Sequence, residues 1–322
     1  MVQVKDVLLA QQRIHPYIFR TPLRYSFLLS RRTGATVLLK LENWQITGSF
    51  KPRGALSVMT TLTPEERRRG VVTASAGNHA LGVAHAARAL GIEPATIFIP
   101  RTAPQAKIGK LREFRVEVRS VGDTYADAHH AAEEYQRETG ATFIHAYEDP
   151  RTIAGQGTAG LEILEDSPEL DAVLVPVGGG GLISGIAIAV KTFLPKAKII
   201  AVQPSASPAL RDSLRDGRCY EEYVSAPTIC DGLAGGIGKT IFELAPKYID
   251  DIVMVEEEET KEAIRALIET QQLVVEGAGA VGVAALLAGK AGLAGKRVAV
   301  VLSGGNIDLP VLKEILEQTP AI

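Results

Sequence analysis

Short apolar runs alternate with longer amphipathic stretches along the whole chain. The short runs are rich in Val and Ile and apolar on both faces, which is typical of strands in parallel sheets covered on both sides. They predict strands at 37–40, 71–74, 95–100, 116–121, 142–145, 172–177, 198–203, 251–255 and 297–302. The longer stretches have the apolar spacing of helices. They predict helices that include 78–90, 104–114, 124–139, 182–194, 258–274 and 280–288.

This alternation indicates an α/β protein. The chain has 322 residues, which at about 150 residues per domain gives room for two domains. The number of strands fits two sheets. We expect one sheet to hand over to the other near the Asp149-Pro150 step and the Gly-rich stretch 154–160.

Composition and charge exclude several classes of protein. Lys and Arg number 35 against 37 Asp and Glu, a balance that argues against nucleic-acid binding. No apolar run approaches the ~18 residues of a membrane span, and the first residues lack a signal-peptide layout, so we expect a cytoplasmic protein. Two cysteines, Cys219 and Cys230, cannot make a disulfide framework or a four-thiolate zinc site. The histidines show no metal-ligand spacing, and we expect no metal.

Glycine is enriched, with 31 residues, and three glycine clusters directly follow predicted strands. They are Ser75-Ala76-Gly77-Asn78-His79, Gly178-Gly179-Gly180-Gly181-Leu182 and Ser303-Gly304-Gly305-Asn306. Ligands of open α/β sheets bind outside the carboxyl ends of the strands. Four glycines entering a helix also let several backbone N–H groups converge on one anion. The pattern predicts a phosphate site at the tetraglycine loop, although tight turns without a ligand would have the same sequence.

Neither nucleotide motif fits these glycines. From Gly178 or Gly179, the third glycine of a dinucleotide fingerprint would fall on Ile183 or Ser184. The stretch 235–240 ends like a P-loop, but Leu233 stands where its first glycine should be. A phosphate ligand other than a nucleotide is therefore favoured.

Lys51 is a candidate for covalent chemistry. It opens a helix-like segment, with Thr47 or Ser49 available as the cap. A helix N-terminus and nearby cations destabilise an ammonium, which favours the free amine needed for a Schiff base. Arg53 adds to this effect or faces solvent. A lysine Schiff base together with a phosphate site that lacks a nucleotide fingerprint points to pyridoxal phosphate.

The chain resembles the threonine dehydratases (threonine ammonia-lyases) of the fold type II, or tryptophan synthase β, group of pyridoxal-phosphate enzymes, to which serine racemase is closely related. The motifs run nearly end to end and include Thr21-Pro22-Leu23, residues 49–55 and residues 303–308. The resemblance implies two domains, each with an open, mostly parallel sheet flanked by helices. It implies a large cofactor-binding domain, 1–50 plus 149–322, a smaller mobile domain, 51–148, and a homo-oligomer, either a dimer or a tetramer.

The resemblance also implies a role for each site residue. Lys51 would hold pyridoxal 5'-phosphate as an aldimine and later move the Cα proton, while Phe50 would pack on the pyridine ring. Asn78 would bond the phenolic oxygen and Ser303 would face the ring nitrogen. The phosphate would lie on the backbone of Gly178, Gly179, Gly180, Gly181 and Leu182, and the substrate carboxylate on Ser75, Ala76, Gly77, Asn78 and His79. Glu276 matches a motif that lines the site, or it caps a helix.

The implied reaction is β-elimination of L-threonine, and of L-serine, to a 2-oxo acid and ammonia. Another β-hydroxy amino acid, such as a 3-hydroxyaspartate or a hydroxyectoine-derived one, is an alternative substrate. Serine racemase is disfavoured because it has a serine acid/base where this chain has Ala76. Gln203 stands where the racemase's cation site has an acidic residue, so we expect no structural Mg or Ca ion. The chain length indicates the short catabolic type, without a C-terminal regulatory domain. A nucleotide-binding oxidoreductase and a catalytically silent α/β binding protein are the alternatives from other classes.

Overall fold

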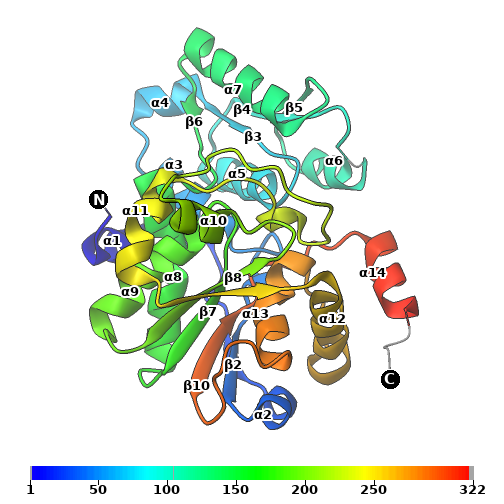
Figure 1. Cartoon of the computed structure of the whole chain (residues 1–322). Helices are drawn as coiled ribbons and strands as arrows, with labels where there is room; N and C mark the ends of the chain where they lie inside the picture. Colours follow the sequence, from blue (N-terminus) through cyan, green and yellow to red (C-terminus); the bar gives the residue numbers. More distant parts are fainter. Residues whose placement is uncertain (1, 104, 319–322) are drawn as a thin grey trace.

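The computed structural model describes residues 2–103 and 105–318, and the strands in this part of the chain form two sheets (Figure 1). The larger sheet has the order β1-β2-β10-β7-β8-β9. Its strands are β1 (Leu23–Tyr25), β2 (Thr36–Lys40), β7 (Ala172–Pro176), β8 (Lys198–Pro204), β9 (Asp251–Val255) and β10 (Arg297–Val301). Only β1, at the edge, runs antiparallel to its neighbour; the other pairings in this sheet are parallel.

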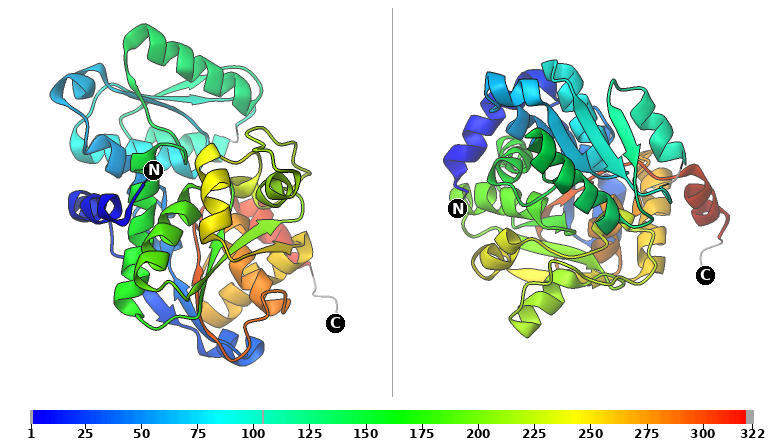
Figure 2. Two further views of the ribbon diagram at one scale, coloured as in Figure 1. Left: turned by 60° about the vertical axis from the view of Figure 1, so that its left-hand side comes forward. Right: turned by 90° about the horizontal axis from the view of Figure 1, so that it is seen from above.

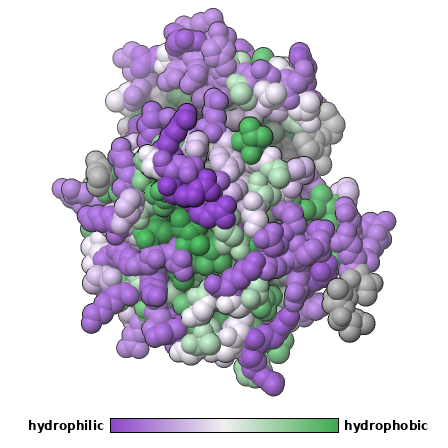
Figure 3. All heavy atoms as spheres, viewed as in Figure 1, coloured by the Kyte–Doolittle hydropathy of each residue, from purple (hydrophilic) through white to green (hydrophobic). Residues whose placement is uncertain are grey.

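The smaller sheet is wholly parallel and has the order β5-β4-β3-β6. Its strands are β3 (Val71–Ala74), β4 (Ala95–Ile99), β5 (Glu117–Ser120) and β6 (Thr142–Phe143). The smaller sheet and its helices stand above the larger sheet in Figure 1 and in the left view of Figure 2. Hydrophilic residues cover this upper part in Figure 3, whereas apolar residues gather lower down, over the larger sheet.

Helices cover both faces of the larger sheet, as its apolar strands require. Val37 and Leu39 of β2 pack in the core that contains α2 (Phe27–Thr33), α12 (Glu257–Gln271) and α13 (Gly277–Leu287). Leu38, between them, points to the opposite face, because successive strand side chains alternate. The helices of that face are α8 (Pro150–Asp166), α9 (Gly181–Phe193), α10 (Ala209–Asp216) and α11 (Lys239–Tyr248).

The smaller sheet is covered in the same way. Val72 and Phe98 pack against α7 (Tyr125–Thr139), while Val71 and Ile97 face the opposite side. The helices of that side are α3 (Lys51–Met59), α5 (Asn78–Leu90) and α6 (Gln105–Arg112). The remaining helical elements are α1 (Val4–Ile14), α4 (Pro64–Arg69), α14 (Leu309–Glu317) and the short 3-10 turns η1 (His15–Tyr17), η2 (Glu42–Trp44) and η3 (Asp231–Leu233). No helix within the described ranges is long and apolar enough to cross a membrane.

The predicted strands and helices are found with small shifts at their ends, and the first residue of the predicted helix 104–114 lies outside the described residues. The expectation for 154–160 is wrong, because this Gly-rich stretch lies inside α8 rather than in a linker. Gly157 and Gly185 bring α8 and α9 close together: a Cβ on Gly157 would lie 2.8 Å from the Gly185 carbonyl oxygen. Asp149 does mark the start of α8, since its side chain accepts from the Arg151 N–H. The domain boundaries at 50/51 and 148/149 stay predictions.

Candidate active site

The end of β10 holds the segment that leads into Lys51. The Phe50 N–H donates to the Ser303 carbonyl oxygen (3.1 Å), and the Gly305 N–H donates to the Gly48 carbonyl oxygen (2.9 Å). Between them, Ser49 and Gly304 form an antiparallel bridge. Two motifs about 250 residues apart are thereby joined at the carboxyl end of a central strand, where α/β sheets bind ligands.

Lys51 is the first residue of α3, and its side chain is partly buried. Its Nζ donates to the Ala146 carbonyl oxygen (3.3 Å) and lies 5.1 Å from the centroid of the Phe50 ring. Burial lowers the pKa of Lys51 to about 8, against the opposing effect of the Glu276 carboxylate. A substantial fraction of this amine is therefore neutral near pH 7 to 8, as a nucleophile or base must be.

Two expectations about the start of α3 are wrong. Neither Thr47 nor Ser49 caps the helix: Phe50 occupies the N-cap position, without a side-chain cap. Arg53 neither faces solvent nor lowers the pKa of Lys51, because it is fully buried between two carboxylates, those of Glu42 and Glu162. The low pKa of Lys51 has a different cause, the burial of its own amine.

Asn78, Glu276 and Asn306 form a closed ring of hydrogen bonds beside Lys51. The side-chain amide of Asn78 donates to Glu276 (2.7 Å) and accepts from the side-chain amide of Asn306 (2.8 Å). The backbone N–H of Asn306 donates to Glu276 (3.1 Å) and closes the ring. These contacts fix which way the Asn78 amide faces. Glu276 occupies the N-cap position of α13, but its side chain does not cap the helix, so the capping interpretation is wrong.

Ser303 and the 75–79 cluster lie at the ends of β10 and β3. Ser303 is buried, and its hydroxyl lies 3.4 Å from the Ala278 carbonyl oxygen. Ser75, Ala76 and Gly77 form a turn in which the Gly77 N–H donates to the Ser75 hydroxyl oxygen (3.2 Å).

The next two residues of this cluster, Asn78 and His79, already belong to the first turn of α5. The buried His79 ring lies 2.8 Å from the Ile144 carbonyl oxygen. Burial, and next the charge of Lys51, lowers its pKa to about 3, so its imidazole is neutral and positions the turn rather than carrying charge.

The tetraglycine loop leads from β7 into α9. Gly180 has φ 95°, a left-handed conformation that favours glycine, and no side chain of the described residues caps the helix. The first N–H groups of a helix have no partner within the helix, and they attract anions. Tyr147 packs against the tetraglycine loop, since a Cβ on Gly181 would lie 2.8 Å from the Tyr147 Cα.

Sequence reasoning missed the segment 145–148, which joins the parts of the site. Ala146 accepts from Lys51, Tyr147 covers the glycine loop, and Glu148 accepts from the Thr240 N–H (3.0 Å) at the start of α11. No motif marks these residues, which follow the short strand β6. The stretch 235–240, whose spacing does not fit a P-loop, also lies here: its Gly238 N–H donates to the Gly179 carbonyl oxygen (3.0 Å).

The donor set fits pyridoxal phosphate. A lysine amine of lowered pKa suits the aldehyde, and the glycine-lined helix N-terminus suits the phosphate. An amide from Asn78 and a hydroxyl from Ser303 suit the ring's oxygen and nitrogen, because each can donate or accept a hydrogen bond.

Comparison with known proteins agrees with this chemistry. Residues 14–304 match the family model described as pyridoxal-phosphate dependent enzyme. The chain is 50% identical over 319 residues to an L-threonine ammonia-lyase of Thermotoga maritima, covering 99% of this chain and 79% of that protein. It is 42% identical over 322 residues to the L-threonine dehydratase catabolic TdcB of Staphylococcus aureus, covering 98% and 92%.

Solved structures agree as well. A threonine deaminase from T.th. superimposes with a TM-score of 0.90 at 40% identity, covering 95% of this chain and 99% of that one. Maize serine racemase gives a TM-score of 0.91 at 34% identity, covering 98% and 97%. The chain belongs to the family of pyridoxal-phosphate dependent enzymes. The predicted family, fold class and cofactor are confirmed, and the two alternatives from other classes are wrong.

Proposed function

We propose that this protein catalyses the β-elimination of L-threonine, and more slowly of L-serine, to a 2-oxo acid and ammonia. The observation that carries the proposal is the Lys51 amine, buried with a pKa of about 8 and joined to the tetraglycine loop through Ala146 and Tyr147. The relatives from Thermotoga maritima and Staphylococcus aureus, named for threonine, support the choice of substrate.

Each part of the site has a task in holding the cofactor. Lys51 would bind its aldehyde carbon, and the backbone of Gly178 to Leu182 its phosphate. Phe50 would pack on the ring, Asn78 would bond the ring oxygen, and Ser303 would face the ring nitrogen. When bound, pyridoxal phosphate supplies an electron sink for negative charge at the substrate Cα.

The protein's own residues then orient the substrate and move the proton. The turn of Ser75, Ala76 and Gly77 would hold the substrate carboxylate at the N-terminus of α5, where backbone N–H groups favour an anion. Once the substrate's own amine had displaced it from the cofactor, the neutral Lys51 amine would take the Cα proton as a general base. The β-hydroxyl would leave with a proton as water, and one water molecule would be consumed in the hydrolysis that gives the 2-oxo acid and ammonia.

Ala76 argues for elimination over racemisation. Racemisation requires a proton donor on the face of Cα opposite Lys51, and a methyl group cannot serve as one. The fold is shared with maize serine racemase, so this residue rather than the architecture carries the distinction.

We further propose a cytoplasmic homo-oligomer, a dimer or tetramer, in which 51–148 forms the smaller mobile domain. The smaller sheet supports the division, since its strands lie between Val71 and Phe143. Large apolar side chains exposed close together in the sequence support self-association; they are Phe19, Tyr25, Phe27, Leu28 and Trp44.

The test is 2-oxo acid release from a panel of β-hydroxy amino acids by the purified protein with pyridoxal phosphate. L-Threonine should give the highest kcat/KM, with L-serine second, and Lys51→Ala should give no product. A higher kcat/KM for a 3-hydroxyaspartate would overturn the substrate, and a product from Lys51→Ala at the normal rate would overturn the mechanism.

A further inference from the structure

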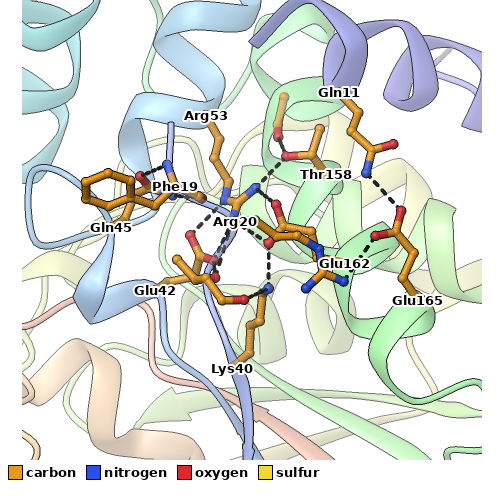
Figure 4. A network of polar contacts seen from close by, with 12 residues as sticks. Gln11, Phe19, Arg20, Lys40, Glu42, Gln45, Arg53, Thr158, Glu162 and Glu165 are labelled. Atoms are coloured by element: carbon orange, nitrogen blue, oxygen red, sulfur yellow. Dashed lines mark hydrogen bonds and ion pairs between the residues drawn. The ribbon is translucent and has the colours of Figure 1, made fainter. Parts of the chain in front are cut away.

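A cluster of four charged side chains lies buried beside α3, the helix that begins at Lys51 (Figure 4). Lys40 ends β2, Glu42 begins η2, Arg53 lies in the first turn of α3, and Glu162 lies on α8. Two positive and two negative charges balance. The exposed fractions of their side chains are 5% for Glu162 and 0% for the other three.

Arg53 stands at the centre of this cluster, and all five of its N–H donors have acceptors. Nε and Nη2 form a fork on Glu42 (both 2.8 Å). Nη1 and Nη2 form a second fork on Glu162 (2.7 and 2.8 Å), and Nη1 also donates to the Thr158 hydroxyl (3.0 Å). A planar guanidinium held by two carboxylates has only one orientation that satisfies every donor.

Stability alone does not account for such a cluster. Desolvating four charges is costly, and well-packed apolar side chains often replace a buried ion pair without loss of stability. Directional forks have one property that apolar packing lacks, because they fix the angle of the side chain and of the backbone that carries it.

That backbone carries Lys51 two residues earlier. At 3.6 residues per turn, two positions are about 200° apart around a helix, so Lys51 and Arg53 project from nearly opposite sides of α3. Lys51 reaches the Ala146 carbonyl oxygen, while Arg53 reaches η2 and α8. A rotation of α3 that moved the Lys51 amine would therefore break the forks of Arg53.

The glycines around α3 affect the distance between helices rather than the rotation of α3 about its axis. A Cβ on Gly82 of α5 would lie 2.9 Å from the Lys51 carbonyl carbon, and one on Gly155 of α8 would meet the Arg53 carbonyl oxygen. These contacts set how closely α5 and α8 approach α3. They carry no hydrogen bond that would resist rotation about its axis.

We propose that Arg53 is a positioning residue whose clamp by Glu42 and Glu162 fixes the rotation of the first turn of α3 and so aims the Lys51 amine. The proposal rests on the function proposed above only for the role of Lys51 in the reaction. The titratable groups that interact electrostatically with this amine are Glu276 at the N-cap of α13, His79 from α5 and His145 from the 145–148 segment, and none of them belongs to the cluster.

Two variants distinguish the orientation of the Lys51 amine from the charge balance of the cluster. Arg53→Lys keeps the cluster neutral but cannot form either fork. The double variant Arg53→Met with Glu42→Gln removes one charge of each sign and leaves Lys40 paired with Glu162. Arg20→Met is the matched control, because Arg20 forms exposed ion pairs with Glu165 and Asp166 at the end of the same α8. Leu267→Ala controls for lost stability, since Leu267 is buried in α12.

The measurements use the cofactor-loaded protein. Visible circular dichroism per bound cofactor reports how rigidly the lysine-linked ring is held, and it needs no substrate. We expect both Arg53 variants to lose about half or more of this signal. Their kcat with L-threonine should fall about ten- to a hundredfold with KM changed less than about threefold, because small misplacements of a reacting group have effects of this size.

Arg20→Met and Leu267→Ala should keep the wild-type signal per bound cofactor, although Leu267→Ala lowers the melting temperature. The proposal is wrong if an Arg53 variant keeps the wild-type dichroism signal and kcat. It is also wrong if, at an equal loss of melting temperature, Leu267→Ala loses as much dichroism signal and kcat as the Arg53 variant does. Should the double variant fail to fold, Arg53→Lys decides. A wild-type protein inactive on L-threonine but with the expected dichroism changes would refute the proposed function and leave this inference standing.

Discussion

Lys51 owes its chemistry to its surroundings more than to its position at a helix start. Burial lowers the pKa of its amine, whereas the charge of the Glu276 carboxylate raises it. The same carboxylate also orients the amide of Asn78 (2.7 Å). Glu276 thus acts on two of the proposed site residues at once. Its removal should therefore shift the pKa of Lys51 in a defined direction.

Replacing Glu276 with Gln should lower the pKa of Lys51 below its value of about 8, because an attractive negative charge is lost. The rate at which cofactor-free protein takes up pyridoxal phosphate should follow the neutral amine. In the wild type it should rise with pH through a midpoint near 8 and level off above it. The midpoint of Glu276→Gln should lie lower; an unchanged or higher midpoint would contradict the assigned electrostatics.

Ala76→Ser should introduce racemisation. The serine hydroxyl would supply the acid that the wild type lacks on the second face of Cα. Chiral chromatography of L-serine reactions should show D-serine from the variant and none from the wild type, with Ala76→Val as a control that adds bulk without a hydroxyl. D-Serine formed by the wild type at a rate comparable with elimination would refute this role of Ala76.

Ser303→Asp should slow elimination and increase transamination by-products. A carboxylate facing the ring nitrogen would favour its protonated form, and a stronger electron sink prolongs the life of the carbanion. Ser303→Ala is the control, since it removes the hydroxyl without adding charge. The measurement is the ratio of 2-oxo acid to by-product per turnover. An Asp variant with wild-type rate and ratio would show that Ser303 does not face the nitrogen.

At the scale of single residues, the sequence predicted which side chains form the candidate site better than it predicted their contacts. Motifs named Lys51, Asn78 and Ser303, but the hydrogen bond between Asn78 and Glu276 joins residues 198 positions apart. Tyr147 has no motif at all, because its place depends on how the chain returns from β6 to α8. The buried state of Arg53 was equally invisible, since its partner Glu162 lies 109 residues away.

At the scale of elements, apolar periodicity was sufficient for most strands and helices. It failed at α8, where Gly155, Gly157 and Gly160 serve close helix packing rather than flexibility. It also failed at β1, whose three residues are too short for an alternation to appear. In both cases tertiary contacts override the local signal.

Gly185→Ala should therefore destabilise the protein. Its added methyl group would meet the Ile153 carbonyl oxygen, and overpacking of this kind lowers the free energy of unfolding by about 1–3 kcal/mol. Gly109→Ala on α6 is the matched control: no other atom of the described residues lies within 4 Å of the added methyl group, so it should raise stability by about 0.5–1 kcal/mol. Urea unfolding measures both. Equal effects of the two variants would contradict the α8–α9 contact.

At the scale of the whole molecule, the site lies where the chain passes between the two sheets. The first passage, from β2 to α3, brings Lys51, and the return passage, from β6 to α8, brings Ala146 and Tyr147. The ends of β3, β7 and β10 complete the site with Asn78, the tetraglycine loop and Ser303. Movement of the smaller sheet relative to the larger one would therefore act on Lys51 and on the tetraglycine loop together.

Lys51 should be the residue that holds the cofactor covalently, and this can be measured by borohydride reduction of the loaded protein followed by proteolysis and mass spectrometry. We expect loss of the yellow colour and one phosphopyridoxyl group per chain, on the peptide that contains Lys51 and not on the one that contains the buried Lys40. Modification of a different lysine, or none with a dinucleotide bound instead, would contradict it.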